Sequence, residues 1–177
     1  MGCCNSQNNS DQKRSVRLEF IRTELEDDIA QIGYVSGDVS PSDGSDHTKH
    51  QKQDVIQPGN RDRVLRMLSL AYGEVLEMLY DTTTREVDEG EWDNELDEPE
   101  RYVVDLAVPT TFSKTTVEYL RHAIHEYMIC RVWEDWMSIV DPAQMEIWGA
   151  KCRQAKEDIM KSMAKRGKRL RLRLTPW

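Results

Sequence analysis

One long run of apolar side chains, between Thr115 and Val140, constrains this fold more than any other feature of the sequence. Within that run, apolar residues occupy nearly every direction around a helical axis. A helix that is apolar all round must be enclosed by other parts of the protein. The sequence therefore predicts a central helix over 115–140, started by a capping box between Thr115 and Glu118. Its apolar residues include Val117, Leu120, Ile124, Tyr127, Met128, Ile129, Val132, Trp133, Trp136 and Met137.

Three further segments show the apolar spacing of helices that would pack around the central one. They cover 16–32, 61–80 and 142–166, and a long loop at 33–60 follows the first of them because Gly33 is expected to end it. Asp141 followed by Pro142 is a strong start signal, since proline is favoured at the first helical position. We expect the core to include Leu68, Val75, Ile124, Val132, Trp136, Trp148 and Ile159.

One segment alternates as a β-strand does. Tyr102, Val104, Leu106 and Val108 are separated by single residues, and Pro109 closes the run. Its predicted partner is 82–87.

The fold class predicted is mainly α: a bundle of about four helices with an inserted β-hairpin and a C-terminal basic strand or tail. The domain organisation predicted is a disordered leader at 1–15, a helical domain at 16–166 with its hairpin at 82–109, and a basic tail at 167–177.

Charge is distributed unevenly along the 177 residues, whose net charge is −8. Asp81–Glu100 carries ten acidic residues and one basic, whereas Lys151–Trp177 carries ten basic and two acidic. Such asymmetry predicts a partner for each end, or contact between the two ends of neighbouring copies. Two separately solvated faces are the simpler alternative.

Basic and apolar residues alternate in the C-terminal tail. Leu170, Leu172 and Leu174 fall on one face of an extended chain, and Arg169, Arg171 and Arg173 fall on the other. A basic run can bind nucleic acid. The regular leucines instead favour a strand that adds to another subunit, using main-chain hydrogen bonds for affinity and leucine pockets for register. Trp177 is a candidate to dock on the same neighbour.

One cluster in the central helix has the residue types of a metal site. Glu118, His122 and Glu126 share one helical face, with His125 beside them. Di-iron bundles need further Glu and His ligands from other helices, and the last helix has no histidine. Ordinary salt-bridged polar residues are therefore the favoured interpretation. With no catalytic motif and no C-x-x-C spacing in the chain, we expect no enzyme activity, metal or cofactor.

The chain begins MGCCNS, which fits an N-myristoylation pattern with Cys3 and Cys4 available for a second lipid. A lipidated, membrane-associated helical regulator is therefore the alternative functional class. The mass of the native protein would distinguish it.

Two segments carry a resemblance to a known family: YVVDLAVPTTFSKTTVE and AIHEYMICRVWEDWMSIVDP, with the closing LTPW. They resemble the small head–tail connector (adaptor, neck ring) proteins of tailed bacteriophages and prophages, those of gut Bacteroides-type hosts in particular. The resemblance implies a homo-oligomeric ring, typically of twelve copies, that sits beneath the portal protein and meets tail or further neck proteins. It implies a virion protein at the head–tail junction, made in the host cytoplasm, with no catalytic residues and no membrane association. MGCCNS would then be a coincidence.

In such a ring, DNA would pass through without specific binding. A carboxylate-lined channel would repel the duplex instead of gripping it. The candidate channel-lining residues are Glu86, Asp88, Glu89, Glu91, Asp93, Glu95, Asp97, Glu98 and Glu100. The rival interpretation is that these residues contact the basic tail of the next copy.

Overall fold

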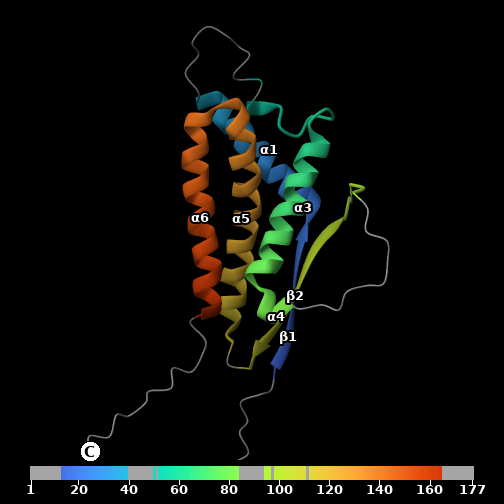
Figure 1. Ribbon diagram of the computed structural model, residues 1–177, viewed down its shortest axis with the longest axis vertical. Coiled ribbons are helices and arrows are strands. Elements are labelled where there is room, and N and C mark those ends of the chain that lie inside the picture. The colour runs from blue at the N-terminus through green and yellow to red at the C-terminus, as the bar shows by residue number, and fades with distance from the viewer. Residues whose placement is uncertain are drawn as a thin grey trace, which may run out of the picture.

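Helix α5 (Lys114–Val140) runs through the centre of this protein (Figure 1). The computed structural model describes residues 13–39, 50, 52–83, 94–96, 98–110 and 112–164. The fold is mainly helical with a two-stranded antiparallel sheet, which confirms the predicted fold class. The other elements, in chain order, are β1 (Lys13–Ile21), α1 (Arg22–Val39), α3 (Arg61–Met78), α4 (Tyr80–Thr83), β2 (Arg101–Pro109) and α6 (Pro142–Ala164).

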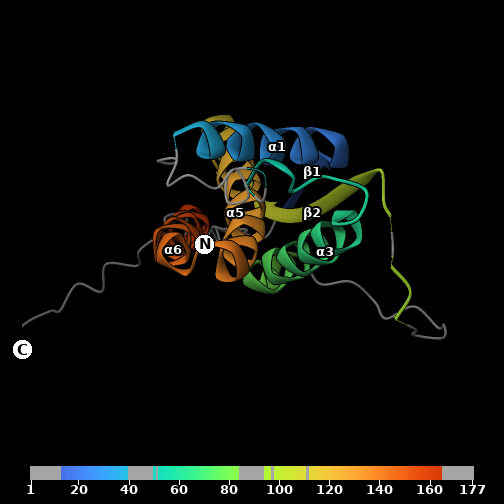
Figure 2. The same ribbon diagram turned by 90° about the horizontal axis from the view of Figure 1, so that it is seen from above.

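The elements around α5 cover it from several sides, as its composition requires. Figure 2 shows α6, α1 and α3 arranged around α5, with the sheet on the side of α3. Helix α5 contributes the fully buried Trp133, Leu120 and Met128 to the core, among other residues. It begins at the N-cap Ser113, whose Oγ accepts a hydrogen bond from the Thr116 N–H at 3.3 Å. Pro142 opens α6, as the sequence predicted.

The start of the predicted helix over 16–32 is wrong, because residues 13–21 form strand β1. This strand also includes the last three residues of the predicted leader. It pairs antiparallel with β2, Leu18 opposite Val104. The predicted partner at 82–87 is also wrong where the structure describes it, since Thr82 and Thr83 belong to α4; residues 84–87 lie outside the described part.

The helix prediction failed at residues 16–21 because this stretch fits both the helical spacing and the alternation of a strand. Leu18, Ile21 and Leu25 have helical spacing, but Val16, Leu18 and Phe20 alternate. In the structure Leu18 and Phe20 are buried while Ile21 is 37% exposed, so the alternation determines the structure. Outward-facing charges match as well: Arg17 Nε donates to Asp105 Oδ1 at 2.8 Å across the two strands.

Helix α1 continues through Gly33 to Val39, so the loop predicted from residue 33 starts too early. Gly33 and Gly37, one turn apart and both buried, face the segment that crosses α1 at Lys52 and Gln53. A Cβ atom on Gly33 would lie 2.7 Å from the Lys52 carbonyl oxygen, and one on Gly37 would lie 2.7 Å from the Gln53 Cγ. At Gly33, glycine therefore permits a close approach of the Lys52 backbone, whereas at Gly37 it makes room for the Gln53 side chain.

This crossing segment also contacts the turn between α5 and α6. The ammonium group of Lys52, a largely buried residue, lies 3.0 Å from Asp141 Oδ2 at the turn between α5 and α6. The hydrogen bond from Lys52 holds the pKa of the Asp141 carboxyl below its usual value. Lys52 thus connects α1 to the α5–α6 turn.

The predicted core is correct for Leu68, Val75, Ile124, Val132 and Ile159, which are all buried. It is wrong for Trp136 and Trp148, which are only partly buried against the core. Trp133 is the fully buried tryptophan, and the Trp148 ring stacks on it at a centroid distance of 5.6 Å.

Within the described residues, no helix combines the length and the hydropathy needed to cross a membrane.

The two kinds of glycine position should respond oppositely to alanine. We expect Gly33→Ala to destabilise the protein by about 1–3 kcal/mol, because the new methyl group overlaps the Lys52 carbonyl. Gly73→Ala, where a Cβ would meet nothing within 4 Å on helix α3, should stabilise it by about 0.5–1 kcal/mol. Urea unfolding of both variants measures the difference. Equal effects would show that the approach at Gly33 is not tight.

Candidate functional site

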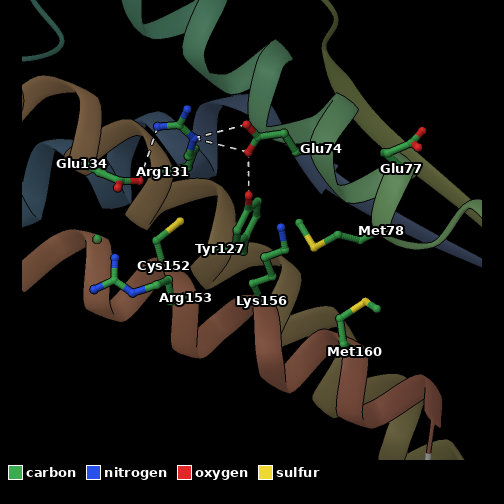
Figure 3. A pocket seen from close by; sticks show the side chains of 11 residues that line it. Glu74, Glu77, Met78, Tyr127, Arg131, Glu134, Cys152, Arg153, Lys156 and Met160 are labelled. Atoms are coloured by element: carbon green, nitrogen blue, oxygen red, sulfur yellow. Dashed lines mark hydrogen bonds and ion pairs between the residues drawn. The ribbon is translucent and has the colours of Figure 1, made fainter.

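A cleft of about 680 Å³ lies between α3, α5 and α6, and charged side chains of both signs line it (Figure 3). Glu74 and Glu77 come from α3, Arg131 and Glu134 from α5, and further cations from α6. Because ionisable groups that converge in a cleft mark candidate active sites, their chemistry decides what this cleft can do.

The centre of the cleft is a hydrogen-bonded network between α3 and α5. The Tyr127 hydroxyl donates to Glu74 Oε2 at 2.5 Å, and Arg131 Nε lies 3.3 Å from the same oxygen. Arg131 also donates to Glu134 Oε2 at 3.4 Å. Burial and the hydrogen bond to the Glu74 carboxylate raise the pKa of the Tyr127 phenol. The phenol therefore stays protonated and acts as a donor that joins the two helices.

The two buried cysteines, Cys130 and Cys152, are not activated nucleophiles. Burial raises the pKa of the Cys152 thiol to about 12 and that of Cys130 to about 11. A reactive cysteine instead has its pKa lowered, so that the thiolate is present at neutral pH.

Arg153 and Lys156 of α6 also line the cleft beside Cys152 (Figure 3). The cleft thus has three acidic and three basic side chains whose charges balance.

The four α5 residues weighed as a metal cluster have separate surroundings in the structure. His125 Nε2 lies 2.7 Å from Asp28 Oδ2 of α1, and Glu118 lies 3.6 Å from Lys114 in its own helix. His122 and Glu126 face a different hollow, described below. Among the described residues, no three His, Cys, Asp or Glu side chains are placed to hold a metal ion.

One of the acidic residues predicted to line a channel has partners within the subunit. Glu98 Oε2 accepts hydrogen bonds from Arg22 at 3.2 Å and from Arg61 at 2.9 Å. The Arg22 N–H also donates to the Glu100 carbonyl at 3.1 Å. These contacts hold the end of the acidic segment against the starts of α1 and α3. Glu95 is also among the described residues, whereas Glu86, Asp88, Glu89, Glu91, Asp93 and Asp97 lie outside them.

The predicted tail contacts also lie outside the described residues, which end at Ala164. This applies to Arg169, Leu170, Arg171, Leu172, Arg173, Leu174 and Trp177.

A second hollow, of about 890 Å³, was not predicted from the sequence. We call it the α1–α6 groove. Helices α1 and α6 form its walls and one face of α5 forms its floor. Its apolar lining includes Ile32, Val35 and Val39 of α1, Ala123 of α5, and Trp148 and Ala155 of α6. The hollow depends on α1 continuing beyond Gly33, which the sequence pattern did not indicate.

Comparison with known proteins returns no matching family model, no matching curated protein and no matching solved structure.

The network in the cleft should contribute to stability. Tyr127→Phe removes the hydroxyl that bonds a carboxylate while keeping the ring, so we expect a loss of about 1–2 kcal/mol in the free energy of unfolding. Tyr34→Phe, on an exposed side chain of α1, is the matched control and should change it by less than about 0.5 kcal/mol. Chemical denaturation measures both. A Tyr127→Phe variant as stable as the control would contradict a structural role for the network.

Proposed function

We propose that this protein is a structural subunit of a bacteriophage neck, forming a ring between the portal and the tail and extending the DNA channel. The resemblance of residues 102–118 and 123–142 to connector proteins supports the assignment to this family. Most of these residues belong to β2 and α5, so the resemblance covers most of the central helix.

The observation that carries an assembly role is a concentration of exposed apolar side chains at one end of the bundle. Figure 1 shows that the C-terminal end of α1 and the turn between α5 and α6 lie at this same end. Val39 is 78% exposed there, Ile139 59% and Ile147 52%, with Met145 also exposed. Large apolar groups left in contact with water at one place mark interaction sites. We call these four residues the apolar end.

A ring made of one chain requires contacts between different surfaces of neighbouring copies, because head-to-tail interfaces close into rings. The apolar end provides one such surface. The oppositely charged segments at 81–100 and 151–177 favour a second contact, with the tail residues Leu170, Leu172 and Leu174 against a neighbouring subunit or the portal.

The acidic segment has a separate role under this proposal. DNA has to slide through the channel during packaging and ejection, and cationic contacts to phosphates would slow it. Carboxylates at 86–97 would repel the duplex and keep it centred. Glu98 is not needed for this role, since Arg22 and Arg61 already balance its charge.

Disrupting the apolar end should prevent ring formation. We expect purified wild-type protein, or protein mixed with portal, to form closed rings by negative-stain electron microscopy and native mass spectrometry. The double variant Ile139→Asp/Ile147→Asp should stay monomeric, because charged groups would be buried at the contact. Leu70→Asp is the control, since Leu70 is also exposed but lies on α3.

Two results would count against this proposal. Rings that form equally well from the double variant would exclude the apolar end as a contact. A protein that antibody labelling does not find at the neck of virions would exclude the neck function itself.

Reversing the charge of the acidic segment separates its two possible roles. In phage carrying Glu86→Lys, Asp88→Lys, Glu89→Lys and Glu91→Lys together, we expect rings to assemble while DNA ejection slows or stalls, because the lumen would then bind phosphates. The same four positions changed to Gln are the control for loss of charge alone. Rings that fail to form would show instead that the segment contacts the next subunit.

A further inference from the structure

The α1–α6 groove leaves apolar surface uncovered along the side of the bundle. Val35 lines it and is 60% exposed. The side chains on its floor, Ala123 and Cys130, belong to α5, the helix that the rest of the fold encloses. Because exposed apolar surface favours an occupant, a segment of this chain outside the described residues is the first candidate.

Four segments of three or more residues lie outside the described part: 1–12, 40–49, 84–93 and 165–177. The first has Met1 as its only large apolar residue besides cysteine, and the second has none. The third has Val87 and Trp92 among five carboxylates. Only the last has a series of large apolar residues without any acidic residue. Its leucines alternate with arginines, so an extended chain would present one apolar face.

The reach of this tail matches the groove. The tail follows Ala164 at the end of α6, and Asp158, at the near end of the groove, lies about 9 Å back along that helix. The α6 wall from Trp148 to Asp158 is about 15 Å long at the same rise per residue. An extended chain of residues 165–169 covers about 16 Å, enough to turn back to Asp158, and 170–174 then spans about 13 Å along the wall.

Charge favours the same placement. Residues 165–177 carry six basic residues and no acidic one, so the rest of the chain, without those six charges, has a net charge of −14. Glu126 and Asp158 are among the residues that line the groove, where they can meet the arginines between the leucines. The groove also contains His122 and Lys151, and the Lys151 ammonium lies 4.0 Å above the Trp148 ring.

We propose that the free subunit folds its own tail into the α1–α6 groove, with Leu170, Leu172 and Leu174 against the apolar lining. The arginines between them face the carboxylates and solvent. This proposal does not rest on the neck function, because it concerns the single chain before any assembly.

Carbodiimide cross-linking of the full chain tests the placement, because it joins a lysine to a carboxylate in direct contact. An equal mixture of ¹⁵N-labelled and unlabelled protein, diluted until native mass spectrometry finds only the monomer, is cross-linked, digested and analysed by mass spectrometry. We expect Lys168 joined to Asp158, with both peptides of each pair carrying the same isotope. Pairs of mixed isotope would show that the tail occupies a neighbour's groove, and the absence of the link would show that it occupies neither; each result overturns the proposal.

Variants then test whether the leucines and the groove hold the tail. Leu170→Ser/Leu172→Ser/Leu174→Ser should lower the yield of the link at least fivefold, and so should Val35→Arg in the groove wall. Tyr34→Arg is the matched control, since Tyr34 is the adjacent residue, is 63% exposed and does not line the groove; its yield should equal the wild type. Unchanged yields in the leucine or Val35 variants would mean that charge alone attracts the tail, which would also overturn the proposal.

Discussion

The need to enclose helix α5 governs the rest of this structure. Its apolar residues surround the axis, and burying apolar surface contributes about 25 cal/mol per Å², so each neighbouring element takes its place by covering part of α5. Helix α6 packs antiparallel to it, α3 lies along another side, and α1 and the sheet close further sides (Figure 2). The α1–α6 groove is one part of this enclosure that the described residues leave open.

Enclosing α5 brings polar groups together as well, and their pairing keeps the helices in register. Tyr127 and Arg131 of α5 meet Glu74 of α3, and His125 meets Asp28 of α1. Lys52 reaches Asp141 from a segment that packs closely against Gly33 and Gly37 of α1. Each of these contacts joins segments far apart in the sequence. They therefore specify one arrangement of the helices, which apolar packing alone would leave less defined.

Local signals predicted the helices over α3, α5 and α6 and the strand over β2, because periodicity and the Asp141–Pro142 start are properties of neighbouring residues. The predicted cap of α5 is wrong, since Ser113 and not Thr115 is its N-cap. The other misses involve distant partners. Residues 16–21 fit both a helix and a strand, and pairing with 101–109 decided between them. Glycine is about 1 kcal/mol less favourable than alanine inside a helix, so Gly33 was expected to end this one. In the structure, contact with residues 52–53 outweighs that cost. The arginine partners of Glu98 and the α1–α6 groove likewise depend on the tertiary arrangement, which no local pattern encodes.

The pairing of β1 with β2 has a consequence for how the chain reaches this structure. The facing residues Arg17 and Asp105 are 88 positions apart, so the first strand leaves the ribosome long before its partner exists. Closing so large a loop costs conformational entropy that is recovered only when both strands and α5 are in place. High contact order of this kind slows folding even in mainly helical domains. Strand β1 is thus made before the other described elements and is among the last that can be completed, and until then its unpaired edge is open to association with other nascent chains.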